Sequence, residues 1–344
     1  MAESKGCSCS SAACCFPASD EQGRKTTSRV TFQDLWGNFL ARIGIGRNRH
    51  RVNPGLYRLG DPGREAPVLV TANYKMSFDH LRSRLPGRDA WILVLDTKGV
   101  NVWCAAGKGT FGTKELVSRL SVTGLEGVVE HRTLILPQLG AVGVAAHEVF
   151  GKTGFRVVYG PVRADDLPRF LDNGMKKDAE MRKVEFPAAD RLILTSVELM
   201  RALGFYLPAM AALLAAAWLL RPALDRIATF EVVSLGGAVF IGTVLFPWAL
   251  PILPFRPFSA KGAVLGAIWS AVMVLVFRLR PAEALGALLV LTPLVSFLSV
   301  NFTGSTTFTT LSGVKRELSV AIPAFIVSAG IGVALKVLAG LRLV

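Results

Sequence analysis

Five long apolar stretches in the second half constrain the fold of this chain more than any other feature. They lie at about 202–220, 230–250, 262–278, 282–300 and 318–339. Each approaches the ~20 residues that a helix needs to cross hydrocarbon about 30 Å thick. The connectors are short and charged, and the stretches leave no helix face for water, so a buried helical core is the weaker interpretation. We therefore expect an all-α transmembrane domain of five helices over residues 202–344.

The distribution of charge indicates that a soluble domain precedes these spans. Of 39 basic and 25 acidic residues, only ten basic and four acidic ones follow residue 201. We expect a tail over residues 1–28, a soluble domain over 29–185 and a linker over 186–201. The tail holds four cysteines (Cys7, Cys9, Cys14 and Cys15) and lacks the apolar core of a signal peptide. We therefore expect the soluble domain to stay cytoplasmic, attached to the cell (inner) membrane.

The soluble half alternates short apolar runs with helical patterns. The runs lie at 67–71, 90–95, 132–136 and 155–159, and the helical patterns at 77–85, 113–121, 144–150 and 164–171. This alternation predicts βαβ units and an α/β domain with a Rossmann-like, mostly parallel sheet. Ligands of such sheets bind beyond the carboxyl ends of the strands. The loops 72–75, 96–108, 137–141 and 160–163 therefore qualify, and the longest of them holds Cys104, the one cysteine outside the tail.

The loop around this cysteine carries the clearest chemical pattern. It reads Asn101-Val102-Trp103-Cys104-Ala105-Ala106-Gly107-Lys108. A thiol that opens a short helix near a cation is favoured as a thiolate. The small residues that follow let a flat ligand approach the backbone, and Trp103 can wall the pocket. The residues alone leave open a nucleophilic cysteine, a metal thiolate and a buried, inert cysteine.

The whole run resembles the signature of the HgcA family, the corrinoid protein of the mercury-methylating pair. Further segments resemble the same family, and the resemblance covers about residues 50–344, including the five spans. These segments are 71–75, 131–132 with 134–140, 159–163 and 301–304.

The resemblance implies a domain similar to that of the corrinoid iron–sulfur protein, with a corrinoid (cobalamin) cofactor. Cys104 would be the catalytic residue and, from a cap helix, the lower axial ligand to cobalt. The implied cofactor-binding residues are Thr71, Asn73, Asn101, Val102, Trp103, Cys104, Ala105, Ala106, Gly107, Lys108, Gln138 and Gly140. Lys108 would help to hold the thiolate charge or a corrin side chain, or be a solvated lysine.

The implied reaction is corrinoid-dependent transfer of a methyl group to Hg(II) in an anaerobic prokaryote. Hg(II) is a soft electrophile that accepts methyl as a carbanion equivalent. The cobalt(III) left behind is stabilised more by a charged thiolate than by a neutral imidazole. The implied partners are a small ferredoxin with two [4Fe–4S] clusters as electron donor and a methylated folate, acting through a methyltransferase, as methyl source. The chain itself has no cluster motif.

Two alternatives remain open for the function. One is a membrane corrinoid methyl carrier with a different acceptor, since no residue evidently selects mercury. The other is a membrane transporter or receptor with a soluble ligand-binding domain. Prolines that interrupt the spans favour this alternative, but the small number of charged residues in the spans counts against it. The net charge of +14 fits acidic lipid headgroups or an acidic ferredoxin, and no motif supports nucleic acid.

Several weaker signals complete the interpretation. Residues 146–153 satisfy a relaxed P-loop pattern, but they are expected inside a helix that precedes a strand, with Gly151 as the helix stop. The four histidines are not spaced as metal ligands. Glu231 is the one acid well inside a span, where it marks a polar path or an interfacial position. The tail cysteines capture Hg(II) or belong to a dispensable segment.

Overall fold

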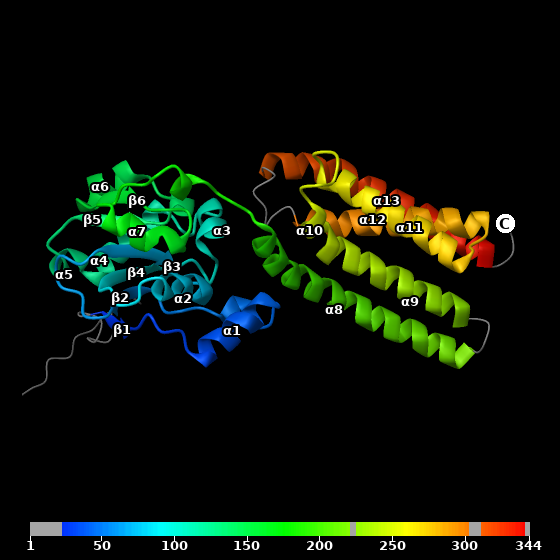
Figure 1. Ribbon diagram of the computed structural model, residues 1–344, viewed down its shortest axis with the longest axis horizontal. Coiled ribbons are helices and arrows are strands. Elements are labelled where there is room, and N and C mark those ends of the chain that lie inside the picture. The colour runs from blue at the N-terminus through cyan, green and yellow to red at the C-terminus, as the bar shows by residue number, and fades with distance from the viewer. Residues whose placement is uncertain (1–22, 221–224, 303–310, 341–344) are drawn as a thin grey trace, which may run out of the picture. The chain divides into compact units, whose positions relative to one another are not determined.

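The computed structural model describes residues 23–220, 225–302 and 311–340, so the tail cysteines lie outside the described residues. The chain forms two compact units, which are described separately (Figure 1). Unit 1 comprises the residues up to Ala41 together with Ile45–Lys183. Unit 2 comprises Arg42–Gly44 and Val184–Val344.

Unit 1 is built on one six-stranded sheet (Figure 1). Its strands are β1 (Arg24–Thr26), β2 (Gly55–Leu59), β3 (Val68–Ala72), β4 (Ala90–Leu95), β5 (Thr133–Leu136) and β6 (Arg156–Tyr159). The order is β1-β2-β4-β3-β5-β6, with β2 antiparallel to β4 and every other pair parallel. The predicted α/β class is confirmed, and β3, β4, β5 and β6 are the four expected strands. The edge strand β1 and its neighbour β2 were not predicted.

Helices flank this sheet and connect its strands. The α-helices of unit 1 are α1 (Phe32–Arg42), α2 (Lys75–Ser83), α3 (Val102–Gly107), α4 (Thr113–Thr123), α5 (Leu125–Val128), α6 (Ala146–Thr153) and α7 (Leu167–Asp172). The 3₁₀ turns are η2 (Arg47–Arg49), η3 (Gln138–Gly140), η4 (Ala164–Asp166) and η5 (Glu180–Arg182).

The central strands are buried on both faces, which explains their continuous apolar runs. Along β4, Leu93 and Leu95 belong to one hydrophobic cluster, which includes Leu116 of α4 and Val149 of α6. The alternate residues of β4 belong to a second cluster with Phe78 of α2 and with α7. The period of two along a strand thus supplies both layers of the core.

The relaxed P-loop lies in α6, which precedes β6, as predicted, so its backbone does not open a helix after a strand. The prediction that Gly151 ends this helix was wrong. The helix continues to Thr153, and Gly154 ends it in the left-handed region at φ +72°. A non-glycine residue is disfavoured there, so Gly154 is the true stop signal.

Helix α1 is attached to α2 by a cluster of charges. Asp34 contacts Lys75 at 2.6 Å and Arg82 at 2.7 Å, and Asp79 contacts both cations at 2.5 and 2.8 Å. Burial alone would raise the pKa of Asp34, but hydrogen bonds from Lys75 and from Thr31 lower the pKa well below its usual range. Asp34 is therefore ionised at neutral pH, and its contacts with the two cations join the two helices.

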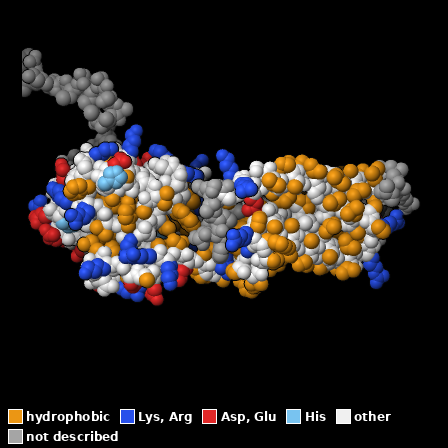
Figure 2. All heavy atoms as spheres, turned by 90° about the horizontal axis from the view of Figure 1, so that it is seen from above, with side chains coloured by type: hydrophobic (Ala, Val, Ile, Leu, Met, Phe, Trp, Pro, Cys, Tyr) orange, Lys and Arg blue, Asp and Glu red, His pale blue; other side chains and the backbone are white. Residues whose placement is uncertain are grey.

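Unit 2 is helical. Its α-helices are α8 (Ala188–Leu220), α9 (Asp225–Phe240), α10 (Phe246–Ala249), α11 (Phe258–Phe277), α12 (Pro281–Asn301) and α13 (Leu311–Gly340), and the π-helical stretch η6 (Ile241–Leu245) joins α9 to α10. Helix α8 begins inside the predicted linker 186–201. Among the described residues, five segments are long and apolar enough to cross a membrane: Ala188–Ala216, Ala228–Ala249, Phe258–Phe277, Pro281–Asn301 and Gly313–Gly340. Hydrophobic side chains cover much of the visible surface of this unit (Figure 2), as expected of helices that face lipid.

Glycines allow close packing between the helices of unit 2. A Cβ on Gly262 or Gly266 of α11 would lie 2.7 Å from Cα of Ser296 or 2.8 Å from Cα of Thr292, both on α12. A Cβ on Gly332 of α13 would lie 2.9 Å from the carbonyl oxygen of Gly286 on α12. Lipid supplies no hydrophobic drive for helix association, so such close van der Waals packing holds the bundle together.

Glu231 of α9 forms an ion pair with Lys336 of α13. The ammonium group of Lys336 also lies 4.9 Å from the ring centre of Phe230. A charged side chain among spans is costly unless it is paired, so the two residues neutralise each other inside the bundle.

We predict that Asp34→Asn loosens α1, because it leaves Lys75 and Arg82 to share the single carboxylate of Asp79. At pH 7 the amide hydrogens of α1 should exchange roughly 10- to 100-fold faster, the equivalent of losing about 1.5–3 kcal/mol of charged hydrogen bonding. Because the folded pKa is lowered, this stabilisation is present above the ordinary value of 3.8 and is lost as the pH falls towards the folded value.

Hydrogen exchange measured at pH 7 and below pH 3.8 checks both statements. The matched control is Asp61→Asn, which removes an exposed carboxylate 3.8 Å from Arg58 and should change little. Equal exchange of α1 in the two variants at pH 7 would show that the network does not hold this helix.

Candidate functional site

Three of the predicted loops meet at the carboxyl ends of the central strands. β3 ends at Ala72, β4 at Leu95 and β5 at Leu136, and all three strands run in the same direction. Helix α3, which follows β4, contacts both β3 and η3, which follows β5 (Figure 1). β3 has β4 as its neighbour on one side and β5 on the other. Open α/β sheets bind ligands at the carboxyl ends of strands arranged in this way.

The side chain of Asn73 ties the end of β3 to the loop that follows β4. Its carboxamide oxygen accepts three hydrogen bonds: from the amide of Thr97 at 3.1 Å, from the hydroxyl of Thr97 at 2.9 Å and from the amide of Gly99 at 2.9 Å. Its amide group donates to Asp96 at 3.1 Å. Asn73 and Thr97 are both buried, so these bonds are shielded from competing water.

The backbone between Thr97 and Val100 forms a tight turn that needs this support. Lys98 and Gly99 both have positive φ, at 59° and 75°, and the amide of Val100 donates to the carbonyl of Thr97. Positive φ is unfavourable for lysine. Asp96 compensates, because its carboxylate accepts from the amide of Lys98 at 3.1 Å and from its ammonium at 2.6 Å. Burial raises the pKa of Asp96, but the hydrogen bonds and charge of Lys98 lower it by more. The pKa therefore lies below its usual value, and Asp96 is ionised at neutral pH.

The turn delivers Asn101 to the start of α3. The side chain of Asn101 accepts a hydrogen bond from the amide of Cys104 at 2.9 Å and caps the helix. Ala105 and Ala106 are buried against the domain, whereas Cys104 is exposed and is a free cysteine. The helix therefore presents its one thiol outward and anchors itself through alanines.

Glycines let the loop after β5 lie directly against α3. A Cβ on Gly143 would lie 2.0 Å from the carbonyl oxygen of Phe111 and 3.1 Å from Cα of Ala106. A Cβ on Gly140 would lie 2.6 Å from the ring of Phe111. Gly140 is buried, so its direct contribution is to backbone packing beneath the cap helix.

The outer surface of this region exposes apolar side chains and bare backbone. Trp103 is 40% exposed and Val142, in the loop that packs on α3, is 81% exposed. A Cβ on Gly107 would have no neighbour within 4 Å, and Lys108 at the end of the helix is exposed. An exposed thiol beside bare backbone and apolar side chains suits a flat, bulky ligand.

The other predicted residues take supporting positions. Thr71 is buried within β3, and Val102 opens α3 and packs on the core. The side-chain oxygen of Gln138 accepts a hydrogen bond from Lys177. Burial, aided by the neighbouring charge of Arg182, lowers the pKa of that lysine. Direct contact of these residues with a cofactor stays a prediction.

Three residues that shape the loop were not predicted. Thr97 fills the space beneath Asn73, and Gly143 permits the approach of the loop to α3. Glu115 of α4 accepts a hydrogen bond from the amide of Asp96 at 2.8 Å and pairs with Arg119 at the same distance. The Asp-Thr pair directly after a buried strand was the available signal, since polar residues there usually bind backbone groups.

Histidines and acids do not assemble a metal site in the part of the chain that the structure describes, where no group of three or more potential ligands lies together. His131 contacts the carbonyl of Ala66 at 2.9 Å and accepts from the amide of Thr133 at 3.2 Å. His50 contacts Asn38 at 2.7 Å. Both act as the local hydrogen-bonding residues that the sequence indicated.

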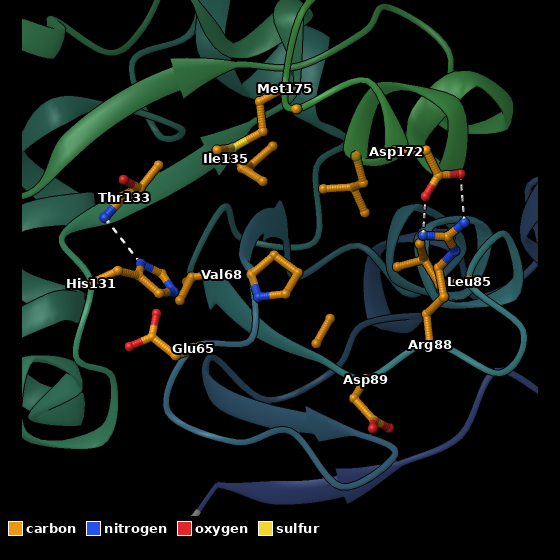
Figure 3. Close-up of a pocket in the computed structure, with 14 residues that line it drawn as sticks. Glu65, Val68, Leu85, Arg88, Asp89, His131, Thr133, Ile135, Asp172 and Met175 are labelled. Carbon is orange, nitrogen blue, oxygen red and sulfur yellow. Dashed lines mark hydrogen bonds and ion pairs between the residues drawn. The ribbon is translucent and has the colours of Figure 1, made fainter.

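A pocket of about 570 Å³ lies at the opposite edge of the sheet, where β3, β4 and β5 begin. Figure 3 shows His131 bonded to Thr133 on one side, and Arg88 paired with Asp172 on the other through two contacts of 2.8 Å. These groups already satisfy one another. The pocket is separated from Cys104 by the length of the strands.

Comparison with known protein families finds a match within unit 1. Residues 46–171 match the family described as CO dehydrogenase/acetyl-CoA synthase delta subunit. This range contains every predicted site residue and none of the five apolar spans.

Individual relatives are gamma subunits of the acetyl-CoA decarbonylase/synthase complex. The subunit of Methanopyrus kandleri is 35% identical over 128 residues, which are 37% of this chain and 27% of that subunit. That of Methanothermobacter thermautotrophicus is 32% identical over 128 residues, 37% and 28% of the two chains. That of Archaeoglobus fulgidus is 32% identical over 124 residues, 36% and 26%. The chain thus spans about a quarter of the length of these relatives.

Proposed function

We propose that unit 1 binds a corrinoid against α3 and serves as a methyl carrier, with Cys104 as the lower axial ligand to cobalt. The observation that carries the proposal is the placement of Cys104. Its thiol is exposed on a capped helix at the ligand-binding edge of the sheet. It lies within residues 46–171, which match the family described as CO dehydrogenase/acetyl-CoA synthase delta subunit.

The residues present fit a flat macrocycle. Ala105 and Ala106 are buried and anchor the helix, and Gly107 leaves its outer side bare. Trp103, next to Cys104 in the chain, offers exposed apolar surface, as does Val142 in the loop that packs on α3. Cobalt accepts soft thiolate ligands. The chain would bind the cofactor, orient the thiol through Asn101 and keep water from one side of the ring.

The finer proposal names Hg(II) as the substrate that receives the methyl group. When bound, a corrinoid would supply a methyl group carried on cobalt. The thiolate of Cys104 would favour transfer of that group to Hg(II) as a carbanion equivalent, because a charged ligand stabilises the cobalt(III) left behind. This step rests on the resemblance of residues 101–108 to the HgcA signature. The ferredoxin and the methylated folate rest on the same resemblance. We place unit 1 in the cytoplasm, where reducing conditions preserve a free thiol.

A methyl carrier with another acceptor is the second candidate. The similarity to subunits of acetyl-CoA decarbonylase/synthase complexes favours it, since those relatives are not named for mercury. The two candidates share the cofactor and Cys104 and differ in the acceptor alone.

Asn73 and Asn101 act in this proposal as positioning residues. Asn73 fixes the turn 97–100, the turn places Asn101, and Asn101 caps the helix that carries Cys104. Neither side chain needs to touch the cofactor in order to control where the thiol lies.

We predict that Asn73→Ala frees the turn 97–100, because it removes three bonds to one buried oxygen. The amides of residues 97–104 should exchange at least about 10-fold faster, and the affinity for corrinoid should fall as the thiol loses its fixed position. Hydrogen exchange and cobalamin titration measure the two effects. Asn173→Ala, at an exposed position of unit 1, is the control. Unchanged exchange at the turn would contradict the positioning role.

We predict about one cobalt per chain in protein purified anaerobically from cells supplied with cobalamin. Cys104→Ala should alter the ultraviolet–visible spectrum, because the thiolate ligand is lost. The matched control replaces the four tail cysteines by alanine, which leaves Cys104 as the one thiol of the chain, and should retain the wild-type spectrum. A folded wild type without cobalt would remove the proposal and bring the transporter or receptor alternative forward.

We predict that anaerobic membranes with the wild-type chain and its reductant form methylmercury from Hg(II). Loss of the cobalt ligand in Cys104→Ala should reduce the rate at least about 100-fold, and Cys104→His should retain corrinoid but lose much of the rate. Methylmercury measured by mass spectrometry with isotopically labelled Hg(II) is the readout. A corrinoid-loaded wild type that forms none would favour the carrier with another acceptor.

A further inference from the structure

Helix α1 carries an exposed apolar stripe that neither the core of unit 1 nor the proposed site uses. Phe32, Leu35, Trp36 and Phe39 recur at positions i, i+3, i+4 and i+7, which places them on one face of the helix. They are 78, 58, 53 and 50% exposed. The rings of Trp36 and Phe39 stack on each other at 5.5 Å, so the stripe is a continuous surface.

The opposite face of α1 is fixed to unit 1 by polar contacts. Asp34 pairs with Lys75 and Arg82, and Asn38 donates to Asp79 at 3.1 Å. Ala41 on the same face is fully buried. The helix therefore cannot turn its apolar stripe inward without breaking the charged network, and the stripe is held outward.

We propose that this stripe binds a lipid surface with anionic headgroups. The described residues include five segments long and apolar enough to cross a membrane, and the chain links unit 1 to them. Aromatic and leucine side chains opposite a polar face are typical of helices that lie in the membrane interface.

The charge around α1 specifies the kind of lipid. Residues 24–51 contain seven arginines and lysines and one acid, Asp34, which is already paired inside unit 1. Arg42 at the end of the helix and Arg49 in the following turn are exposed. Each such cation near a bilayer is attracted by anionic headgroups.

A second copy of the chain is a poorer occupant for this stripe. Four side chains of one short helix offer an area on the order of 500 Å². A stable protein interface buries about 800 Å² on each partner. A bilayer has no such minimum, because apolar insertion and headgroup attraction add up residue by residue.

The test uses the full chain in nanodiscs and isolates the emission of Trp36 as the difference between wild type and Trp36→Phe. Lipids brominated near the headgroup should quench roughly half of this emission, and lipids brominated deep in the chain should quench less, because interfacial helices insert only about 5–10 Å. The quenching should be stronger in discs with phosphatidylglycerol than in discs with phosphatidylcholine alone.

A charge variant and its matched control sharpen the test. Replacing Arg42 and Arg49 by glutamine should reduce the quenching in phosphatidylglycerol discs. Replacing Lys152 and Arg156, which are exposed elsewhere on unit 1, removes the same charge and should leave the quenching unchanged. Equal effects of the two variants would show that only net charge matters and would overturn the assignment to α1.

Two further results would also overturn the proposal. Red-shifted, unquenched Trp36 emission would show that water covers the stripe. Blue-shifted emission that neither brominated lipid quenches would show that protein covers it, either the spans of the same chain or a second copy.

Discussion

A single carboxamide oxygen, that of Asn73, organises the loop on which the candidate site depends. It accepts two backbone amides and one hydroxyl from the turn that follows β4. Each bond lies in a buried, weakly polar environment, where an unmade bond would be costly. This turn then fixes the position of Asn101, and the side chain of Asn101 caps the first residues of α3. The position of an exposed thiol is thus determined by a side chain one strand away.

Close packing by glycine serves both units, for different physical reasons. In unit 1, Gly143 lets the loop after β5 pack directly against Ala106 of α3. The outer side of α3 at Gly107 stays free of side chains. In unit 2, Gly262 and Gly266 bring two apolar helices into backbone contact. Water drives burial in the first case. In the second, the solvent is as apolar as the helices, so contact area itself is what stabilises the bundle.

The periodic parts of the fold were predictable from the sequence. The four strands β3 to β6 and five apolar helices follow from runs such as 90–95 and 262–278, whose length and composition admit few other structures. The edge strand β1 and its neighbour β2 were missed. β1 is only three residues long, and β2 pairs antiparallel outside the βαβ pattern.

The location of the candidate site was predictable from the sequence, but the hydrogen bonds and contacts that hold its loop were not. The strand-end rule and the lone cysteine identified the loop 96–108. Sequence patterns do not show that Asn73 reaches Thr97 and Gly99, because that contact depends on two strands lying side by side. Likewise, the glycine at 143 has no local turn signal, and only the approach of Ala106 explains it.

The ion pair between Glu231 and Lys336 carries a consequence for the order in which unit 2 is assembled. The two residues are 105 positions apart, and Lys336 lies near the end of α13, the last span. During synthesis, α9 therefore exists for some time without its partner cation. A lone acid near the end of a span opposes insertion, although by less than the ~2.5–3.5 kcal/mol of a charge at the helix centre. The apolar residues of that span offset this cost until α13 arrives, so the bundle locks only when the last helix is in place.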